Sequence, residues 1–218
     1  MTLIPDDAPL LLTGFDPFGG DALNPSWLLA QRLAGQTIAG HPVVAEQLPT
    51  VFAAAPARLR AALSRHQPAL AVALGLAAGR AAISLERVAI NVIDTCIPDN
   101  AGAQPIDAPV AARGPAAYFS TLPIKAMRAA MLAAGAPVEI SQTAGTFVCN
   151  QVFYMLMRQL ARSPSLAATR GGFIHLPQLP EQGQPSLSLD VMARSLRAGL
   201  AAAFEHPADL PYAGGAVS

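Results

Sequence analysis

The first third of the chain alternates short strand-forming runs with longer amphipathic runs, and this alternation constrains the fold more than any other feature. Strands are predicted at residues 9–13, 42–48 and 69–75. Helices are predicted between them, from Asn24 or Pro25 to Gly35 and from Val51 to His66, with Pro25 at an early helical position. This order of elements is typical of a doubly wound α/β sheet.

The rest of the chain continues the pattern around one long irregular segment. Further strands are predicted at residues 84–92, 137–141 and 171–176, and helices at residues 123–134, 151–160 and 189–204. Within the first of these strands, Glu86 shares an apolar face with Val88 and Ile90, where a carboxylate needs a partner. Residues 94–122 contain several Pro and Gly, and a loop of this length is usually functional or mobile.

Length and composition indicate one folded unit that associates with copies of itself. The 218 residues show no linker-like change of composition, so residues 1–218 are expected to form a single domain, with flexible ends at residues 1–8 and 207–218. Hydrophobic residues make up 52% and charged residues only 13%, which favours apolar surface covered in a homo-oligomer. Acidic and basic residues are equal at 14 each, without a basic stripe, so no nucleic-acid or membrane partner is predicted.

The N-terminal segment and the cysteine content indicate the cellular compartment. The N-terminus carries two acidic residues ahead of a very short apolar run, which does not fit a signal peptide, and no run is long enough to span a bilayer. The two cysteines, Cys96 and Cys149, form no disulfide framework and show no metal-ligand spacing. A reducing cytoplasm, a free reactive thiol and no metal are therefore expected.

The segment from Thr143 to Asn150 places Cys149 where a turn gives way to a helix. Unpaired N–H groups and the positive end of the helix dipole favour the thiolate there, and the thiolate is the form that attacks a carbonyl. The same amides could hold a developing oxyanion. Because free cysteines are often small buried hydrophobes, that interpretation of Cys149 stays open. Cys96 lies in the long loop without such a turn and is treated as incidental.

A thiol nucleophile needs a base, and the chain has only four histidines. His175 follows Phe173 and Ile174 at the C-terminal edge of a predicted strand, where α/β sheets gather active-site residues. Glu86 is the acid expected to orient its imidazole. The alternatives are a satisfied core histidine and an ion pair of Glu86 with Arg80 or Arg87.

Glycine-containing loops suggest two hypotheses about a ligand. Phe15, Phe18 and Phe147 lie on glycine-containing loops and could form an apolar slot for a flat uncharged ring, or could be core aromatics. The segment from Gly75 to Arg80 resembles a phosphate loop only weakly, since Leu76 and two alanines give it no strong anion preference.

These motifs together resemble those of pyroglutamyl peptidase I, a family of cysteine peptidases also called pyrrolidone carboxyl peptidases. The resemblance extends from Leu11 to about Asp190. The segments that carry it are residues 13–20 (TGFDPFGG), 24–26 (NPS), 86–91 (ERVAIN), 97–100 (IPDN), 122–125 (LPIK), 143–150 (TAGTFVCN), 171–175 (GGFIH) and 185–190 (PSLSLD).

The resemblance implies a fold, an activity and a set of roles. The fold would be a single-domain three-layer α/β/α sandwich around a mostly parallel twisted sheet, commonly tetrameric and cytoplasmic, without a cofactor. The activity would be hydrolysis of the N-terminal pyroglutamyl residue of peptides through a thioester acyl-enzyme. The implied catalytic residues are Cys149, His175 and Glu86; the implied substrate-binding residues are Phe15, Phe18 and Phe147 around the lactam, Asn24 as its hydrogen-bond partner, and Leu76.

The chain departs from the family pattern at two positions. Leu76 stands where the family often has Gln, and Cys96 where it often has Arg. Both departures fall in loops expected near the site. Two rival functions therefore stay open at this stage: a phosphate-using transferase on a similar sheet, suggested by residues 13–20 and 75–80, and a protein that binds pyroglutamyl ends without cleaving them.

Overall fold

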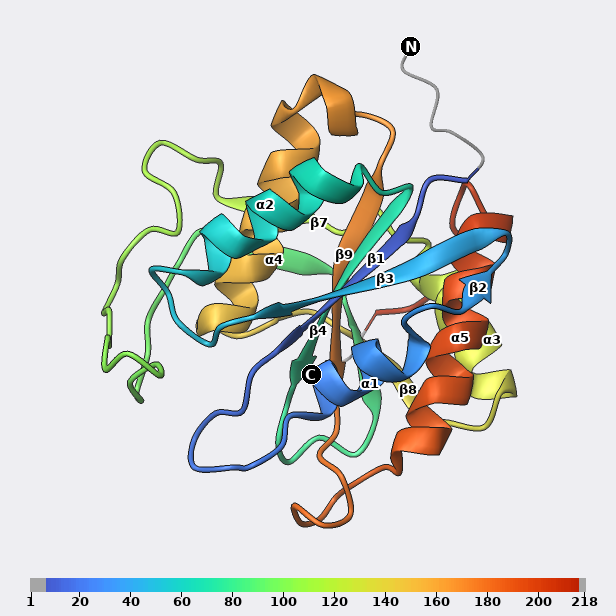
Figure 1. Ribbon diagram of the computed structural model, residues 1–218, viewed down its shortest axis with the longest axis horizontal. Helices are drawn as coiled ribbons and strands as arrows, with labels where there is room; N and C mark the ends of the chain where they lie inside the picture. The colour runs from blue at the N-terminus through green and yellow to red at the C-terminus, as the bar shows by residue number, and fades with distance from the viewer. Residues whose placement is uncertain (1–6, 216–218) are drawn as a thin grey trace.

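The computed structural model describes residues 7–215, which form a central seven-stranded sheet, a separate two-stranded sheet and helices on both faces of the central sheet (Figure 1). The strands are β1 (Leu10–Phe15), β2 (Thr37–Ile38), β3 (His41–Leu48), β4 (Leu70–Leu76), β5 (Ile83–Glu86), β6 (Val88–Ile90), β7 (Ala117–Phe119), β8 (Val138–Ser141) and β9 (Arg170–Leu176). The helices are α1 (Pro25–Leu33), α2 (Ala55–His66), α3 (Ile124–Ala133), α4 (Val148–Arg162), the short 3-10 helix η1 (Pro164–Leu166) and α5 (Leu189–Glu205).

The central sheet is mostly parallel, as the alternating sequence pattern predicts. Its order is β2-β3-β1-β4-β9-β5-β8, and β3, β1, β4 and β9 run parallel to one another. The exceptions are β2, a short edge strand that the sequence pattern did not predict, and the pair β5 and β8, which run parallel to each other and antiparallel to β9. The carboxyl ends of β1, β4 and β9 therefore meet at one edge of the sheet.

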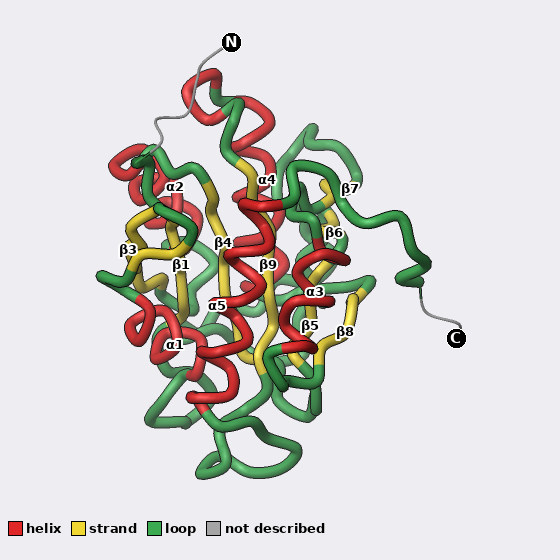
Figure 2. The backbone as a smooth tube through the Cα atoms, turned by 90° about the vertical axis from the view of Figure 1, so that its right-hand side faces the viewer, coloured by secondary structure: helices red, strands yellow, loops and turns green. Residues whose placement is uncertain are grey.

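Two apolar cores separate the sheet from its helices, which confirms the predicted α/β/α sandwich. One core packs α1, α3 and α5 against one face, and the other packs α2 and α4 against the opposite face. Figure 2 shows α1, α3 and α5 gathered on a single side of the strands. Among the described residues, no helix is both long and apolar enough to cross a membrane.

The single strand predicted over residues 84–92 is wrong, because the chain breaks at Arg87. β5 ends at Glu86 in the central sheet, whereas β6 pairs with β7 in the small sheet. The backbone of Arg87 bridges the two sheets, since its N–H donates to Ser141 and its carbonyl accepts from Ser120. Glu86 consequently shares no face with Val88 and Ile90, and its partners come from other elements.

Smaller differences concern the ends of helices. The helix predicted from Val51 begins only at Ala55, because residues 51–54 form a turn in which the N–H groups of Ala54 and Ala55 donate to the carbonyl of Val51. The last helix begins at Leu189 as predicted, and Ser188 caps it, with its Oγ accepting from the N–H of Val191.

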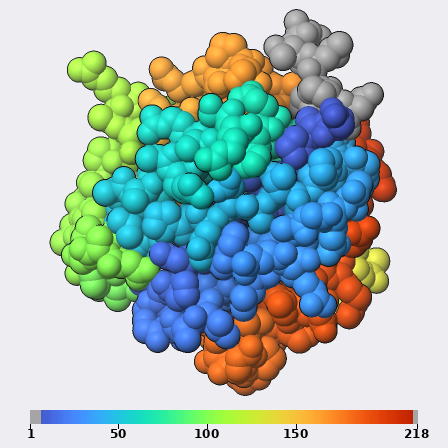
Figure 3. All heavy atoms as spheres, viewed as in Figure 1, coloured from blue at the N-terminus to red at the C-terminus, as the bar shows by residue number. Residues whose placement is uncertain are grey.

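The long segment of residues 94–122 is irregular as expected, apart from β7 at its end. It lies beside the loops that follow β1 and β3: the N–H of Asn100 donates to the carbonyl of Thr50, and the Asn100 amide donates to the carbonyl of Pro17. Asp99 is buried and accepts from the N–H groups of Phe52 and Ala103. Figure 3 shows this green segment along the left edge of the molecule.

The ends of the chain were expected to be flexible over residues 1–8 and 207–218, of which 1–6 and 216–218 lie outside the described residues. The described C-terminal segment is tied to α3 and to Arg87, which lies between β5 and β6. Asp209 accepts from the N–H groups of Lys125 and Ala126 at the start of α3, and Tyr212 donates to the carbonyl of Lys125. Arg87 donates to the carbonyl of Gly214. These contacts anchor residues 209–214.

Asp99→Ala is expected to loosen the long segment. The substitution leaves the N–H groups of Phe52, Ala101 and Ala103 without their acceptor, which costs on the order of 2 kcal/mol of unfolding free energy. Burial acts to raise the pKa of Asp99, but these donated hydrogen bonds outweigh it and hold the pKa below its ordinary value. Thermal unfolding against pH measures the effect.

The depressed pKa fixes the sign of that pH dependence. The Asp99 contribution is fully present above the ordinary carboxyl pKa and is lost as the pH falls through the lowered folded-state value. The melting temperatures of wild type and variant should therefore differ at neutral pH and converge in acid. Asp94→Ala is the control, since this exposed side chain of the same segment makes no hydrogen bond in the described structure. Equal melting temperatures of Asp99→Ala and wild type at neutral pH would contradict the assignment.

Candidate active site

Cys149 is the second residue of α4, as the sequence predicts, and the start of this helix is uncapped. The N-cap residue is Phe147, which makes no side-chain cap hydrogen bond. The nearby threonines do not cap the helix: Thr146 Oγ1 donates to the carbonyl of Asp94, and Thr143 Oγ1 accepts from the N–H of Gly145. Gly145 takes a left-handed conformation with φ 74°, which favours glycine in this turn. The first-turn amides of α4 therefore lack a side-chain acceptor.

The thiol of Cys149 lies against the carboxyl end of β4. A Cβ atom built on Gly75 would be 3.0 Å from Cys149 Sγ and 2.8 Å from the ring of Phe173, so only glycine leaves room for the sulfur. Gly75 is also the register partner of His175 on β9. Thiol and imidazole thus occupy neighbouring positions at one sheet edge. No hydrogen bond joins them in the part of the chain described here, and catalytic contacts are often loose before substrate binds.

His175 is paired with Glu86, as predicted. His175 Nδ1 lies 2.7 Å from Glu86 Oε1, with the imidazole nearly buried and the carboxylate fully buried. This burial follows from topology: because β5 runs antiparallel to β9, Glu86 is level with Phe173, two residues before His175. A hydrogen bond to Nδ1 fixes the ring orientation and leaves Nε2 free to act.

The alternative predicted for Glu86, an ion pair with Arg80, also forms, because Arg80 contacts the same carboxylate. Arg80 Nη1 is 2.8 Å from Glu86 Oε1. Arg87, the other candidate, turns away and donates to Gln142 and to the carbonyl of Gly214.

The remaining histidines have structural surroundings, as the elimination argument expects. His41 stacks on Phe204 and contacts the carbonyl of Ala8, whereas His66 pairs with Glu46. His206 follows α5, where its N–H donates to the carbonyl of Ala202.

The expectation that the helix start alone favours the thiolate of Cys149 is wrong. Burial and, after it, the negative charge of Glu86 raise the pKa of the Cys149 thiol to about 12, although Arg80 and a backbone hydrogen bond act in the opposite direction. Desolvation outweighs the uncapped helix start because the sulfur lies among apolar groups such as Phe173. The thiol is therefore protonated at neutral pH, and its activation requires a base.

An apolar cavity of about 170 Å³ opens beside Cys149. Its lining residues are Phe15, Phe18, Leu23, Asn24, Thr50, Leu76, Ala78, Phe147 and Cys149. The structure thus brings together at this cavity every residue predicted from the resemblance to bind substrate. Leu23, Thr50 and Ala78 were missed, although Leu23 and Ala78 adjoin predicted residues in sequence.

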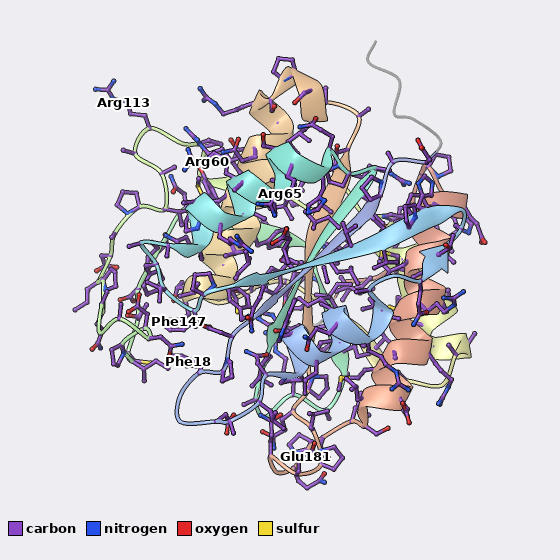
Figure 4. All side chains as sticks on the ribbon, in the orientation of Figure 1. Phe18, Arg60, Arg65, Arg113, Phe147 and Glu181 are labelled. Carbon is purple, nitrogen blue, oxygen red and sulfur yellow. The ribbon has the colours of Figure 1, made fainter. Side chains whose placement is uncertain are left out.

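The aromatic rings of the cavity support one another. The rings of Phe18 and Phe147 lie 5.1 Å apart, and Phe52 meets Phe147 edge-on at 5.3 Å. Figure 4 shows Phe18 and Phe147 close together between the loop after β1 and the start of α4. The three predicted phenylalanines differ in exposure: Phe15 is 2% exposed and belongs to the core, whereas Phe18 and Phe147 are partly exposed.

Asn24 forms the polar end of the cavity and also caps α1. Its Oδ1 accepts from the N–H and the hydroxyl of Ser26, and its Nδ2 donates to the carbonyl of Asp16. Asp16 in turn accepts from the N–H and the hydroxyl of Thr50. Since an amide nitrogen carries two protons, Nδ2 of Asn24 keeps one further donor for a ligand.

The phosphate-loop hypothesis finds no support in the described residues. The only cation of the weak phosphate loop, Arg80, is engaged by Glu86. Residues 7–215 contain no cluster of His, Cys, Asp or Glu that could hold a metal ion, and Cys96 is exposed in the long segment.

A cysteine at an uncapped helix start, beside a buried histidine–carboxylate pair and an apolar cavity, is typical of α/β cysteine hydrolases. Comparison with known proteins narrows this class. The family model for pyroglutamyl peptidase matches residues 8–206. The chain therefore belongs to the pyroglutamyl peptidase family, as the sequence resemblance indicates.

Individual relatives agree with this assignment over nearly the whole chain. It is 54% identical to a pyrrolidone-carboxylate peptidase of Cupriavidus taiwanensis over 211 residues, which cover 94% of this chain and 97% of that one. It is 50% identical to a Klebsiella pneumoniae pyrrolidone-carboxylate peptidase, with 96% and 99% covered. Among solved structures, pyroglutamyl peptidase I from Bacillus amyloliquefaciens matches with a TM-score of 0.92 and 44% identity over 95% of this chain and 100% of that one.

The raised pKa predicts how Cys149 reacts with iodoacetamide. In Cys96→Ala, where Cys149 is the remaining cysteine, alkylation should be slow at pH 7 and keep rising beyond pH 10, because the thiol pKa is about 12. Mass spectrometry of quenched samples measures the rate. In the matched variant Cys149→Ala, the exposed Cys96 should react faster at pH 7. An alkylation rate of Cys149 that is already constant above pH 5 would show a preformed thiolate instead.

Proposed function

We propose that this protein is a cysteine peptidase that hydrolyses the N-terminal pyroglutamyl residue from peptides, with Cys149, His175 and Glu86 as its catalytic residues. One observation carries the assignment of roles: the buried Glu86–His175 pair adjoins the Cys149 thiol at an apolar cavity. Family membership supports the reaction.

In the first step His175 Nε2 takes the proton of Cys149, and the sulfur attacks the pyroglutamyl carbonyl carbon. Glu86 stabilises the imidazolium that forms, through its 2.7 Å contact with Nδ1. This route suits a thiol whose pKa is raised, because the thiolate forms only as it attacks. The uncapped first-turn amides of α4 would hold the negative oxygen.

In the second step His175 returns its proton to the leaving amine as the carbon–nitrogen bond breaks. The peptide departs with a new amino terminus, and the pyroglutamyl group remains on Cys149 as a thioester. Water then attacks the thioester with His175 as general base, which releases pyroglutamate and restores the thiol. The cycle uses no cofactor.

The cavity provides specificity for the lactam. The rings of Phe15, Phe18 and Phe147 would enclose the flat uncharged ring, and the remaining Nδ2 proton of Asn24 would donate to the lactam carbonyl. Leu76 adds an apolar wall where the family often has Gln. An open glutamate would have to leave the hydration of a carboxylate and an ammonium outside this cavity, which strongly disfavours it.

We extend the proposal to the compartment and the assembly. Both cysteines are free, which fits the reducing cytoplasm. A homotetramer would cover apolar side chains that the single chain exposes, notably Ile97 and Ile106 in the long segment and Phe119 in β7. Its partners would be copies of the same chain and peptide substrates.

The central test is hydrolysis of a pyroglutamyl amide with a fluorescent leaving group in reducing buffer. Wild type should turn over, and Cys149→Ala should lose at least about four orders of magnitude in kcat, because no other group can form the thioester. Cys96→Ala, the matched cysteine variant, should keep most of its activity, since Cys96 does not line the cavity.

The outcomes separate the rival functions. Wild type that binds pyroglutamyl peptides without turnover would favour the binding protein and contradict the proposal. Turnover that needs phosphate and survives Cys149→Ala would favour a transferase. Neither rival has a specific structural observation in its favour.

A second test concerns the cavity wall. Phe18→Ala should raise KM about fivefold with kcat nearly unchanged, because it removes one ring that packs on Phe147 and costs about 1 kcal/mol of binding. Phe119→Ala is the control, since this exposed phenylalanine of β7 lies outside the cavity. Steady-state kinetics decide it: an unchanged KM in Phe18→Ala would remove this ring from the binding site.

A further inference from the structure

Arg80 is the one residue at the site whose contacts neither the mechanism nor the cavity explains. It lies in the loop between β4 and β5 and is partly buried, with 29% of its side chain exposed. Its guanidinium donates to Glu86 Oε1, the same oxygen that His175 contacts. One carboxylate oxygen therefore serves both a cation and the proposed base.

The other carboxylate oxygen of Glu86, Oε2, is buried and has no hydrogen-bond partner among the described residues. A fully buried carboxylate with one bare oxygen is costly to keep ionised, so the charge depends on the groups at Oε1. A neutral imidazole there donates one hydrogen bond without charge, and Arg80 supplies the positive charge.

Arg80 also reaches the turn that leads to Cys149. Its Nη2 donates to the carbonyl of Thr143 at 3.3 Å, and its Nη1 lies 3.5 Å from Ser141 Oγ, which itself donates to the same carbonyl. The planar guanidinium thus links the carboxylate on β5 with the first residue of the turn before α4.

We propose that Arg80 is a positioning residue that compensates the buried carboxylate of Glu86 and fixes the turn carrying Cys149 relative to the Glu86–His175 pair. The proposal rests on the proposed function, since the base and the nucleophile are those of the peptidase mechanism. Arg80 touches neither the thiol nor the cavity, so it acts through Glu86 and Thr143.

The charged groups around the pair are few. Arg80 comes from the loop after β4 and Cys149 from α4, while Glu139 on β8 lies one strand further away and accepts from Ser84. Arg80 is thus the only cation within the described part of the chain that contacts Glu86. Its charge also lowers the pKa of Cys149, against the burial that raises it.

The direction of the effect follows from Cys149. The charge of Arg80 lowers the pKa of the Cys149 thiol against the burial that raises it. Without Arg80, the thiol holds its proton more tightly, and the turn before α4 loses its link to Glu86. Transfer of the proton from Cys149 should therefore become slower, while the cavity stays intact.

Three variants test this. Arg80→Gln removes the charge but keeps a hydrogen-bonding side chain. Arg80→Lys keeps the charge but loses the fork between Glu86 and Thr143. Arg87→Gln is the control on the neighbouring arginine, which does not contact Glu86. Arg80→Gln should lower kcat roughly tenfold, with KM within about twofold of wild type. Arg80→Lys should lower kcat less, and Arg87→Gln should match wild type.

Alkylation of Cys149 at pH 9 in the Cys96→Ala background is a second measurement that does not depend on turnover. Arg80→Gln should slow it several-fold relative to Arg80→Lys, because the charge that lowers the thiol pKa is gone. Circular dichroism melts establish that each variant is folded; if Arg80→Gln is not, the Arg80→Lys alkylation rate still has to match wild type.

The outcomes are distinguishable. Wild type without pyroglutamyl turnover contradicts the proposed function, while the alkylation series still tests Arg80. Active wild type with the same kcat and the same alkylation rate in Arg80→Gln as in wild type overturns the inference. Identical behaviour of Arg80→Gln and Arg80→Lys in both assays would reduce Arg80 to a packing role and overturn it as well.

Discussion

The site depends on one buried negative charge, that of Glu86. An ionised carboxylate away from water persists only when positive charge and hydrogen bonds replace its hydration. Here His175 and Arg80 meet at a single oxygen of it, 2.7 and 2.8 Å away. This arrangement fixes the orientation of the imidazole and thereby the role of the neighbouring thiol. The same charge raises the pKa of Cys149, so the group that prepares the base also keeps the nucleophile protonated until the base acts.

Sheet topology brings these groups together. Parallel β1, β4 and β9 end at a common edge, where Phe15, Gly75 and His175 lie on or near the last positions of their strands. β5 runs antiparallel to β9, so its last residue, Glu86, lies level with Phe173 and is fully buried. The start of α4 then places Cys149 against Gly75, where the absent side chain leaves space for sulfur. The loops after β1 and β4 complete the apolar cavity beside it.

Much of the site could be predicted because its chemistry is local in sequence. Cys149 was recognisable from the turn before a helical period, and His175 from its place at a strand end and the poor surroundings of the other histidines. The break in the strand predicted over residues 84–92 could not be predicted, because it depends on backbone partners at Ser141 and Ser120, far away in the chain. The raised pKa of the Cys149 thiol could not be predicted from the sequence either, since it depends on how deeply the sulfur is buried rather than on its place in a helix.

The sequence by itself determined the order of strands and helices, the family, and the residues able to act as nucleophile, base and orienting acid, because periodicity, turn residues and motifs are properties of short segments. Tertiary structure alone decided that Glu86 is shared between His175 and Arg80, that Leu23, Thr50 and Ala78 complete the cavity, and that Cys149 is protonated at rest. The physical reason is common to all three: burial, charge coupling and cavity shape arise from atoms brought together from distant segments, and their strength depends on ångström distances that no single segment specifies.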